Sequence, residues 1–251
     1  MLKITKIKLM ILILLINILF TGCPDGEKTK PDRNSDRKRE NIQAREDNED
    51  KNRESFLLDV PIIPQKPELM SGCEVTSLAM VLQYAGINVD KMTLAKKMRK
   101  DKTPVVLDEK GNIKKWGNPN EGFVGDITGK NKGFAVYNIP MMELMDQYLH
   151  NRAVDLTGKP FESLIKSIDE KHPVIVWATI DFNPPEKYEA WEKNGTKIKA
   201  ALNEHAVVLV GYDKNYCYIN NPFNGVKNQK IKRQSFIRVW NIMGKMAISY
   251  K

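Results

Sequence analysis

Residues 71–82 form the stretch SGCEVTSLAMVL, which places Cys73 in the first turn of a predicted amphipathic helix. Ser71 followed three residues later by Glu74 is typical of a capping box at a helix start. Apolar residues then recur at the spacing of a buried helical face, and Gly86 supplies a stop signal. With Ser71 as the N-cap, free backbone N–H groups and the helix dipole would stabilise a Cys73 thiolate. The stretch therefore predicts a nucleophilic cysteine.

Residues 1–22 have the pattern of a signal peptide that ends at a cysteine. Lysines precede an apolar run from Leu9 to Phe20, which is shorter than the roughly 20 residues of a membrane span. Thr21-Gly22-Cys23 resembles the lipobox of bacterial lipoproteins, in which the cysteine is lipidated and becomes the mature N-terminus. The alternative is an ordinary signal peptide or a short uncleaved anchor. We expect export, and attachment to the outer side of the cell membrane through lipid on Cys23.

Residues 23–55 predict a charged, flexible tether. Between Pro24 and Ser55 there are nine Lys or Arg and ten Asp or Glu, and Ile42 is the one larger aliphatic residue. Such a composition cannot bury enough apolar surface to offset the entropy lost on ordering. Its basic runs favour a solvated spacer over a nucleic-acid patch, and we expect no nucleic-acid partner.

Residues 56–251 are long enough for one domain with a substantial core. The whole chain carries 40 basic and 31 acidic residues, a net charge of +9, and this part is basic as well. A basic surface suits work close to an anionic envelope but selects no substrate. We expect this domain to act as a monomer.

Helical patterns come first in this domain and strand patterns come later, which favours an α+β fold. The expected helices are 73–85, 90–98, one that Pro140 opens and that ends at 150, and one that Pro160 opens. The expected strands are 174–178, 205–212, 216–220 and 245–250, with a turn over 213–215. Residues 111–133 are dense in Gly, Asn and Pro and predict a long surface loop.

Three cysteines limit the redox and metal chemistry of the chain. With Cys23 assigned to lipid, Cys73 and Cys217 remain, and in an exported protein a disulfide between them is an alternative. Cys217 lies in a probable strand, which favours a small buried thiol instead. No C-x-x-C or H-x-x-x-H spacing occurs, and we expect neither a metal nor an organic cofactor.

A nucleophilic cysteine needs a proton-shuttling base, and the chain has three histidines to choose from. His150 ends a predicted helix, where it can complement the helix dipole, and His172 precedes Pro173 in what can be a loop. His205 begins a strongly apolar strand that would hold it rigidly at a cleft. Together with Cys73 upstream, His205 is the favoured base.

Two amides complete the candidate site. The strand after His205 ends in Asn220-Asn221-Pro222, and a tight turn would bring that end beside His205. The side-chain oxygen of Asn221 can accept the imidazole N–H and fix its tautomer. Gln65, together with the backbone N–H of Cys73, can donate to an oxyanion.

The chain resembles the papain-like cysteine peptidases related to the peptidase domains of bacteriocin exporters. The segments that carry the resemblance are Val60-Pro61, Gln65, Gly72–Met80, Gly122–Gly125, Pro173–Trp177, His205–Val208 and Asn221-Pro222. It implies a papain-like fold with an N-terminal helix bearing Cys73 and an antiparallel sheet after it. It also implies Gln65 as oxyanion donor, Cys73 as nucleophile, His205 as base and Asn221 as orienting residue. These peptidases commonly carry Asp where this chain has Asn221, which predicts weaker stabilisation of the imidazolium and lower turnover, or a contribution from Asn220.

The sequence thus predicts a membrane-anchored cysteine peptidase that hydrolyses peptide or related amide bonds in the cell envelope through a thioester. Two alternatives stay open at this stage. An acyl transferase of the same fold would resolve the thioester with an amine instead of water. A catalytically silent module would use the cleft only to bind envelope peptides.

Overall fold

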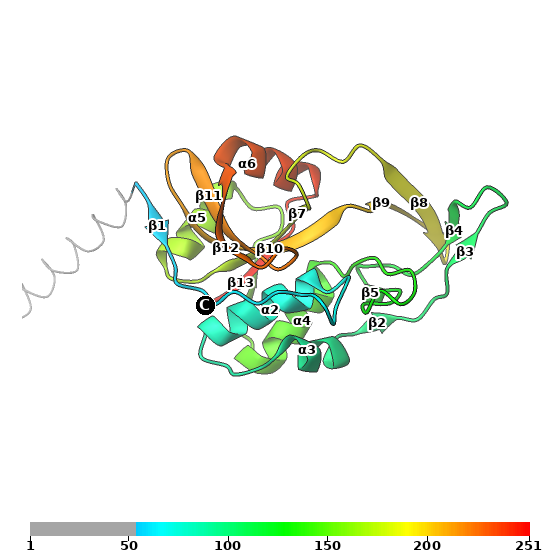
Figure 1. Ribbon diagram of the computed structural model, residues 1–251, viewed down its shortest axis with the longest axis horizontal. Coiled ribbons are helices and arrows are strands. Elements are labelled where there is room, and N and C mark those ends of the chain that lie inside the picture. Colours follow the sequence, from blue (N-terminus) through cyan, green and yellow to red (C-terminus); the bar gives the residue numbers. More distant parts are fainter. Residues whose placement is uncertain (1–53) are drawn as a thin grey trace, which may run out of the picture. The chain divides into compact units, whose positions relative to one another are not determined.

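The structure, a computed structural model, describes residues 54–251 (Figure 1). The predicted signal peptide, Cys23 and the tether as far as residue 53 lie outside this range and stay predictions. None of the described helices has the length and apolar character needed to cross a bilayer.

The described part mixes helices and strands, and helices dominate its first half. The helices are α2 (Cys73–Tyr84), α3 (Lys91–Lys97), α4 (Asn138–Leu149), α5 (Phe161–Asp169) and α6 (Arg233–Ile242). The strands are β1 (Phe56–Leu57), β2 (Lys100–Asp101), β3 (Val106–Leu107), β4 (Ile113–Lys115), β5 (Phe123–Val124), β6 (Ala153–Asp155), β7 (Val174–Thr179), β8 (Tyr188–Lys193), β9 (Thr196–Ala201), β10 (Glu204–Tyr212), β11 (Tyr216–Asn221), β12 (Val226–Lys232) and β13 (Ala247–Tyr250).

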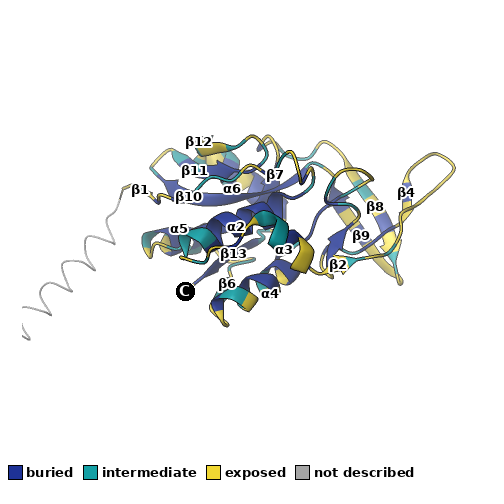
Figure 2. Cartoon of the chain, turned by 60° about the horizontal axis from the view of Figure 1, so that its bottom comes forward, coloured by how far each residue is buried: buried dark blue, intermediate teal, exposed yellow. Residues whose placement is uncertain are grey.

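The main sheet is antiparallel, with the strand order β12-β11-β10-β7-β13-β6, and β1 pairs with the end of β10. Helices α2 and α4 lie on one side of it and α5 and α6 on the other (Figure 1). Every residue of β7 and β10 is buried, as Figure 2 shows, because the central strands are covered on both faces. The α+β expectation and the antiparallel sheet are confirmed.

A second, smaller sheet has the order β3-β4-β8-β9 and its own aromatic core. Trp116 and Trp191 are almost fully buried there, and their ring centroids are 5.7 Å apart. Trp191 also donates its Nε1–H to the carbonyl of Gly117 across 2.8 Å. The β9 strand leads directly into β10, so this sheet is connected to the strand that carries His205.

Several sequence predictions need correction. The predicted surface loop over 111–133 contains β4 and β5, and Trp116 and Phe123 within it are buried. Pro140 lies in the first turn of α4, as predicted, although the helix begins two residues earlier, and Pro160 is the N-cap of α5 and not its first helical residue. Helix α6 and the β8–β9 hairpin are not among the elements predicted from the sequence.

Candidate active site

Helix α2 begins at Cys73 itself, with Gly72 as its N-cap. The predicted capping box is therefore wrong, because Gly72 has no side chain to cap with and the Glu74 carboxylate faces the core instead. A Cβ atom on Gly72 would lie 2.5 Å from the Cβ of Leu69, so this position admits only glycine. The close approach of the preceding loop places the thiol at the first residue of the helix.

Glu74 is fully buried beside the thiol, and both of its oxygens have partners. Its Oε1 accepts the backbone N–H of Val136 at 2.7 Å, and the Cys73 Sγ–H donates to Oε2 at 3.3 Å. Burial raises the pKa of Glu74 to about 7, although the hydrogen bonds to Val136 and Cys73 oppose the shift. Glu74 thus connects the start of α2 to the segment before α4.

The Cys73 thiol is buried and protonated in this environment. Burial raises its pKa well above the ordinary value, and the carboxyl groups of Glu74 and Glu204 raise it further. A hydrogen bond from the backbone N–H of Ala206, on β10, lowers the pKa of the thiol. The expected stabilisation of a resting thiolate by the helix start is therefore outweighed by burial and nearby carboxyl groups.

His205 and Asn221 lie together, as the sequence predicts. The tight turn at 213–215 joins β10 to β11, and the register Val208↔Asn220 brings the first residues of β10 beside the end of β11. His205 Nε2 is 2.8 Å from Asn221 Oδ1. Both residues are 2% exposed.

The partners of Asn221 determine the tautomer of His205. Asn221 Oδ1 also accepts the backbone N–H of Phe223 at 3.1 Å, while its Nδ2 donates to Gln229 Oε1 at 2.9 Å. The atom facing His205 is therefore an acceptor, so Nε2 carries the proton. The lone pair of His205 is left on Nδ1, where it can act as a base.

Burial lowers the pKa of His205 to about 4, although the hydrogen bond to Asn221 raises it. The imidazole is therefore neutral at pH 7. The other two histidines lie elsewhere: His150 is the exposed C-cap of α4, and the ring of His172 packs against Tyr250.

Helix α2 and strand β10 are held together next to these residues. Ser77 Oγ, one turn after Cys73, donates to the carbonyl of Ala206 at 3.3 Å. Ala206 follows His205 directly in sequence, and its backbone N–H is the group that lowers the pKa of the Cys73 thiol. The first residues of α2 and β10 therefore bring the candidate nucleophile and base to one place.

Gln65 lies beside the same site. Its backbone N–H donates to the carbonyl of Pro222 at 2.8 Å, and its side-chain Nε2 donates to the carbonyl of Met70 at 2.8 Å. Gln65 is 2% exposed, and its Oε1 accepts no hydrogen bond from the described residues. One Nε2 hydrogen is thus used to hold the loop before Cys73, and the second remains as a possible donor.

Two further expectations can be examined. Asn220 donates to the carbonyls of Val60 and Pro61 and accepts the N–H of Asn228, so its amide is used to hold the N-terminal segment. Cys73 and Cys217 are both free, so the alternative disulfide is wrong, and Cys217 is the buried strand thiol that was expected.

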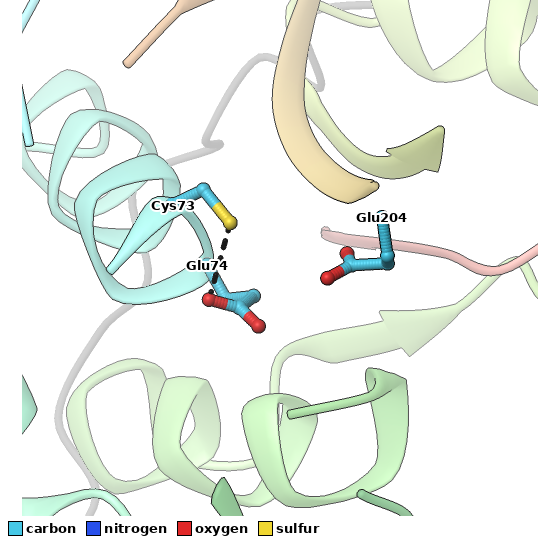
Figure 3. A group of neighbouring side chains, drawn as sticks. All are labelled: Cys73, Glu74 and Glu204. Atoms are coloured by element: carbon cyan, nitrogen blue, oxygen red, sulfur yellow. Dashed lines mark hydrogen bonds between the residues drawn. The ribbon is translucent and has the colours of Figure 1, made fainter. Parts of the chain in front are cut away.

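The sequence analysis missed Glu204, which faces Cys73 and Glu74 from the start of β10 (Figure 3). Glu204 is 7% exposed, and burial followed by the nearby Glu74 raises its pKa well above the ordinary value. A charged residue just before an apolar strand predicts a solvated strand end. Tertiary packing, which brings α2 against β10, buries it instead.

Comparison with known proteins places this chain in a family. The Peptidase_C39 like family matches residues 57–248. The chain belongs to this family. The match covers the whole of the site, from Gln65 to Asn221, so the C39-like assignment rests on the same segment that carries the geometry.

The chain is also similar to individual proteins. The uncharacterized protein YvpB of Bacillus subtilis strain 168 is 40% identical over 182 residues, which cover 72% of this chain and 70% of YvpB. A crystal structure from Bacillus anthracis, described as that of a "putative C39-like peptidase", is 45% identical with a TM-score of 0.71, over 79% of this chain and 98% of that one. The peptidase domain of Streptococcus ComA, a bifunctional ABC transporter, is 16% identical with a TM-score of 0.42, over 75% and 96% of the two chains, and is too distant to inform this site.

The C39-like domain also has a cavity of about 470 Å³ at the strand ends that carry His205. Its lining comes from the segment after β7, the start of β8 and the β9–β10 turn: Asp181, Asn183, Pro184, Glu186, Lys187, Glu189, Leu202 and Asn203. The Ile180 N–H donates to the carbonyl of Asn203 at 3.1 Å. This hydrogen bond lies next to the Thr179↔Glu204 pair, where β7 and β10 meet. A concave surface therefore lies next to the first residues of β10.

Proposed function

We propose that this protein is a membrane-anchored, extracytoplasmic cysteine peptidase that hydrolyses peptide or related amide bonds. The observation that carries the proposal is the hydrogen bond between His205 Nε2 and Asn221 Oδ1, on a strand packed against the helix that begins at Cys73. It leaves His205 Nδ1 as a base beside a candidate thiol nucleophile. Membership of the C39-like family supports the same reaction class.

The first step is attack by the Cys73 sulfur on the substrate carbonyl carbon. Because the resting thiol is protonated and the resting imidazole is neutral, the proton moves to His205 Nδ1 during the attack. Rotation about the Cβ–Sγ bond redirects that proton from Glu74 towards the imidazole. The backbone N–H of Cys73 and the second Nε2–H of Gln65 donate to the developing oxyanion.

The second step releases the amine and then the acid. The imidazolium of His205 donates its Nδ1 proton to the leaving nitrogen, and Asn221 keeps the ring oriented through Nε2. A water molecule then loses a proton to Nδ1 and attacks the thioester, which frees the carboxylic acid and returns the proton to Cys73. Asn221 is neutral, so it stabilises the imidazolium less than the Asp common in related peptidases would.

Product analysis tests the reaction. The full chain, purified in detergent, is incubated with a mixture of synthetic peptides, and the products are identified by mass spectrometry. We expect new carboxyl termini with the wild type and with Cys217→Ala, and none with Cys73→Ala. Products joined to an added amine acceptor would identify a transferase instead. Peptide binding without any cleavage would contradict the proposal and favour a binding module.

The membrane anchor is tested separately. We expect the wild-type protein to fractionate with membranes of the producing cell and to be accessible to a protease added outside. A Cys23→Ser variant should lose membrane attachment through lipid, because the lipid is added to that sulfur. Unchanged mass and unchanged fractionation of the variant would contradict lipid anchoring.

A further inference from the structure

The start of β10 and the start of α2 bring three possible metal ligands together. The Cys73 Sγ, one carboxylate oxygen of Glu74 and one of Glu204 lie within 4.8 Å of one another (Figure 3). Glu204 is far from the other two in sequence, so a search for short-spaced ligand pairs does not find this group. All three residues are buried.

Glu204 points independently to a ligand. It is 7% exposed, and its Oε1 is buried without a hydrogen bond from any described residue. Glu74, in contrast, uses both oxygens, towards Val136 and Cys73. A carboxyl oxygen buried without a partner is strongly unfavourable unless a cation or a donor joins it.

The spacing of the three groups can accommodate one metal ion, which would take the place of the thiol proton now shared between Cys73 and Glu74. The Cys73 Sγ and Glu74 Oε2 are 3.3 Å apart. Sulfur and oxygen ligands of one tetrahedral zinc ion are separated by about 3.5 Å, since the bonds measure about 2.3 and 2.0 Å. The Glu204 oxygen lies within 4.8 Å of the other two ligand atoms, and it would complete three ligands around one ion by moving towards them.

The ligand types indicate which class of metal ion this group would bind. Thiolate with carboxylate suits a borderline-soft divalent cation such as Zn²⁺, whereas Mg²⁺ and Ca²⁺ prefer oxygen ligands alone. Three protein ligands leave the fourth tetrahedral position to water.

We propose that Cys73, Glu74 and Glu204 form a zinc-type metal site that reversibly blocks the nucleophile. On binding, the Cys73 thiol proton and the protons held by the Glu74 and Glu204 carboxyl groups pass to solvent water, and one sulfur and two carboxylate electron pairs form bonds to the metal in place of three metal-bound waters. No electron is transferred. This blocking role rests on the proposed function, because the sulfur electron pair used for the metal is the pair that attacks the substrate. Removal of the metal restores the thiol.

Cobalt binding tests the site without any measurement of activity. The full chain carries Cys23→Ser so that this thiol does not bind metal, and it is titrated with Co²⁺. We expect a thiolate-to-cobalt charge-transfer band in this protein and equally in Cys217→Ser. Cys73→Ser should lose the band, and the isosteric Glu204→Gln should bind Co²⁺ at least ten-fold more weakly. Zn²⁺ should raise the melting temperature of the Cys23→Ser protein and of its Cys217→Ser variant. The melting temperature of Glu204→Gln should rise much less.

Three results would overturn the metal site: no charge-transfer band, a band that survives Cys73→Ser, or unchanged affinity in Glu204→Gln. Glu204→Gln must melt cooperatively without metal, which separates a lost ligand from a lost fold. Peptide hydrolysis by the Cys23→Ser protein should stop on addition of Zn²⁺ and return with a chelator. A cobalt band in a protein that never hydrolyses peptides would contradict the proposed function alone, and hydrolysis without a band would contradict the metal site alone.

Discussion

His205 Nε2 donates to Asn221 Oδ1 across 2.8 Å, and the same oxygen accepts the N–H of Phe223. The imidazole is therefore held in one tautomer by an amide that the backbone itself orients. This relationship connects the ends of two neighbouring strands, and it gives the first prediction.

Asn221→Ala should lower kcat/KM for peptide hydrolysis by about 10²-fold, because the imidazole loses the acceptor that orients its Nε2–H. Steady-state kinetics measure the change. Asn220→Ala is the matched control: its amide holds Val60 and Pro61, so that variant should lose stability while its kcat per folded molecule is retained. Equal kcat/KM in Asn221→Ala and the wild type would contradict an orienting role.

Asn221→Asp should raise the pKa of His205 from about 4, because a carboxylate stabilises the imidazolium more than an amide does. Gln229 must then turn its amide to donate to the new carboxylate. NMR titration of the His205 ring measures the shift. An unchanged or lower pKa would show that the Asn221 side chain does not interact with the ring in solution.

Glu74→Ala should destabilise the protein by about 1–3 kcal/mol, because the buried N–H of Val136 loses its acceptor. Glu74→Gln keeps an oxygen for that N–H and removes a carboxyl group from beside Glu204, so its stability should equal or exceed that of the wild type. Urea unfolding of both variants measures the difference. Similar losses in Ala and Gln would mean that the Val136 contact is not the source of the stability.

Asp101 predicts an acid-sensitive contribution to stability. Burial opposes its ionisation, but Lys193 and the N–H groups of Asn118 and Thr103 outweigh burial and hold the pKa of Asp101 well below its usual value. Asp101→Asn places an amide N–H against the Asn118 N–H and the Lys193 ammonium, and should cost about 2 kcal/mol at pH 7.

A group with a lowered folded pKa stabilises the fold above its unfolded pKa and loses that effect as pH falls. The unfolded value for Asp is about 3.9, so the stability gap between wild type and Asp101→Asn should narrow below about pH 4. Thermal melts from pH 7 to pH 3 measure it. A stability difference between wild type and Asp101→Asn that stays constant from pH 7 to pH 3 would contradict an ionic origin of the Asp101 contribution.

Trp191 should be the main support of the smaller sheet. Trp191→Ala removes ring contacts with Trp116 and Phe134 and should cost about 3–5 kcal/mol. Trp191→Phe keeps an aromatic ring but leaves the Gly117 carbonyl without its donor, at a cost of about 1–3 kcal/mol. Urea denaturation measures the free energy of unfolding of the wild type, Trp191→Phe and Trp191→Ala, which should decrease in that order. If Trp191→Phe were as unstable as Trp191→Ala, the hydrogen bond to Gly117 would be the dominant contribution and the ring contacts would not.

Local patterns predicted the strands that carry the site. Buried apolar runs and a turn at 213–215 define β10 and β11, and antiparallel pairing then brings His205 to Asn221. The missed β8–β9 hairpin had a local signal as well, since Asn194-Gly195 joins its strands with positive φ at both residues.

Other features depend on tertiary packing, and no local pattern predicts them. Glu74 has the spacing of a capping residue, yet it turns inwards because the N–H of Val136 lies there. Trp116 occurs in a stretch rich in Gly and Asn, and it is buried because Trp191 arrives from a distant hairpin. The raised pKa of Cys73 follows from the same packing, which buries the thiol and places the carboxyl groups of Glu74 and Glu204 beside it.

The most direct measurement is the rate at which a peptidyl, thiol-directed electrophile labels each cysteine at pH 7, followed by intact mass and peptide mapping in a Cys23→Ser background. The account predicts rapid labelling of Cys73 and none of Cys217. It also predicts at least about 10²-fold slower labelling of Cys73 in His205→Ala, checked to be folded by its melting curve. Equal labelling in His205→Ala, or modification that persists in Cys73→Ala, would contradict the assignment of nucleophile and base.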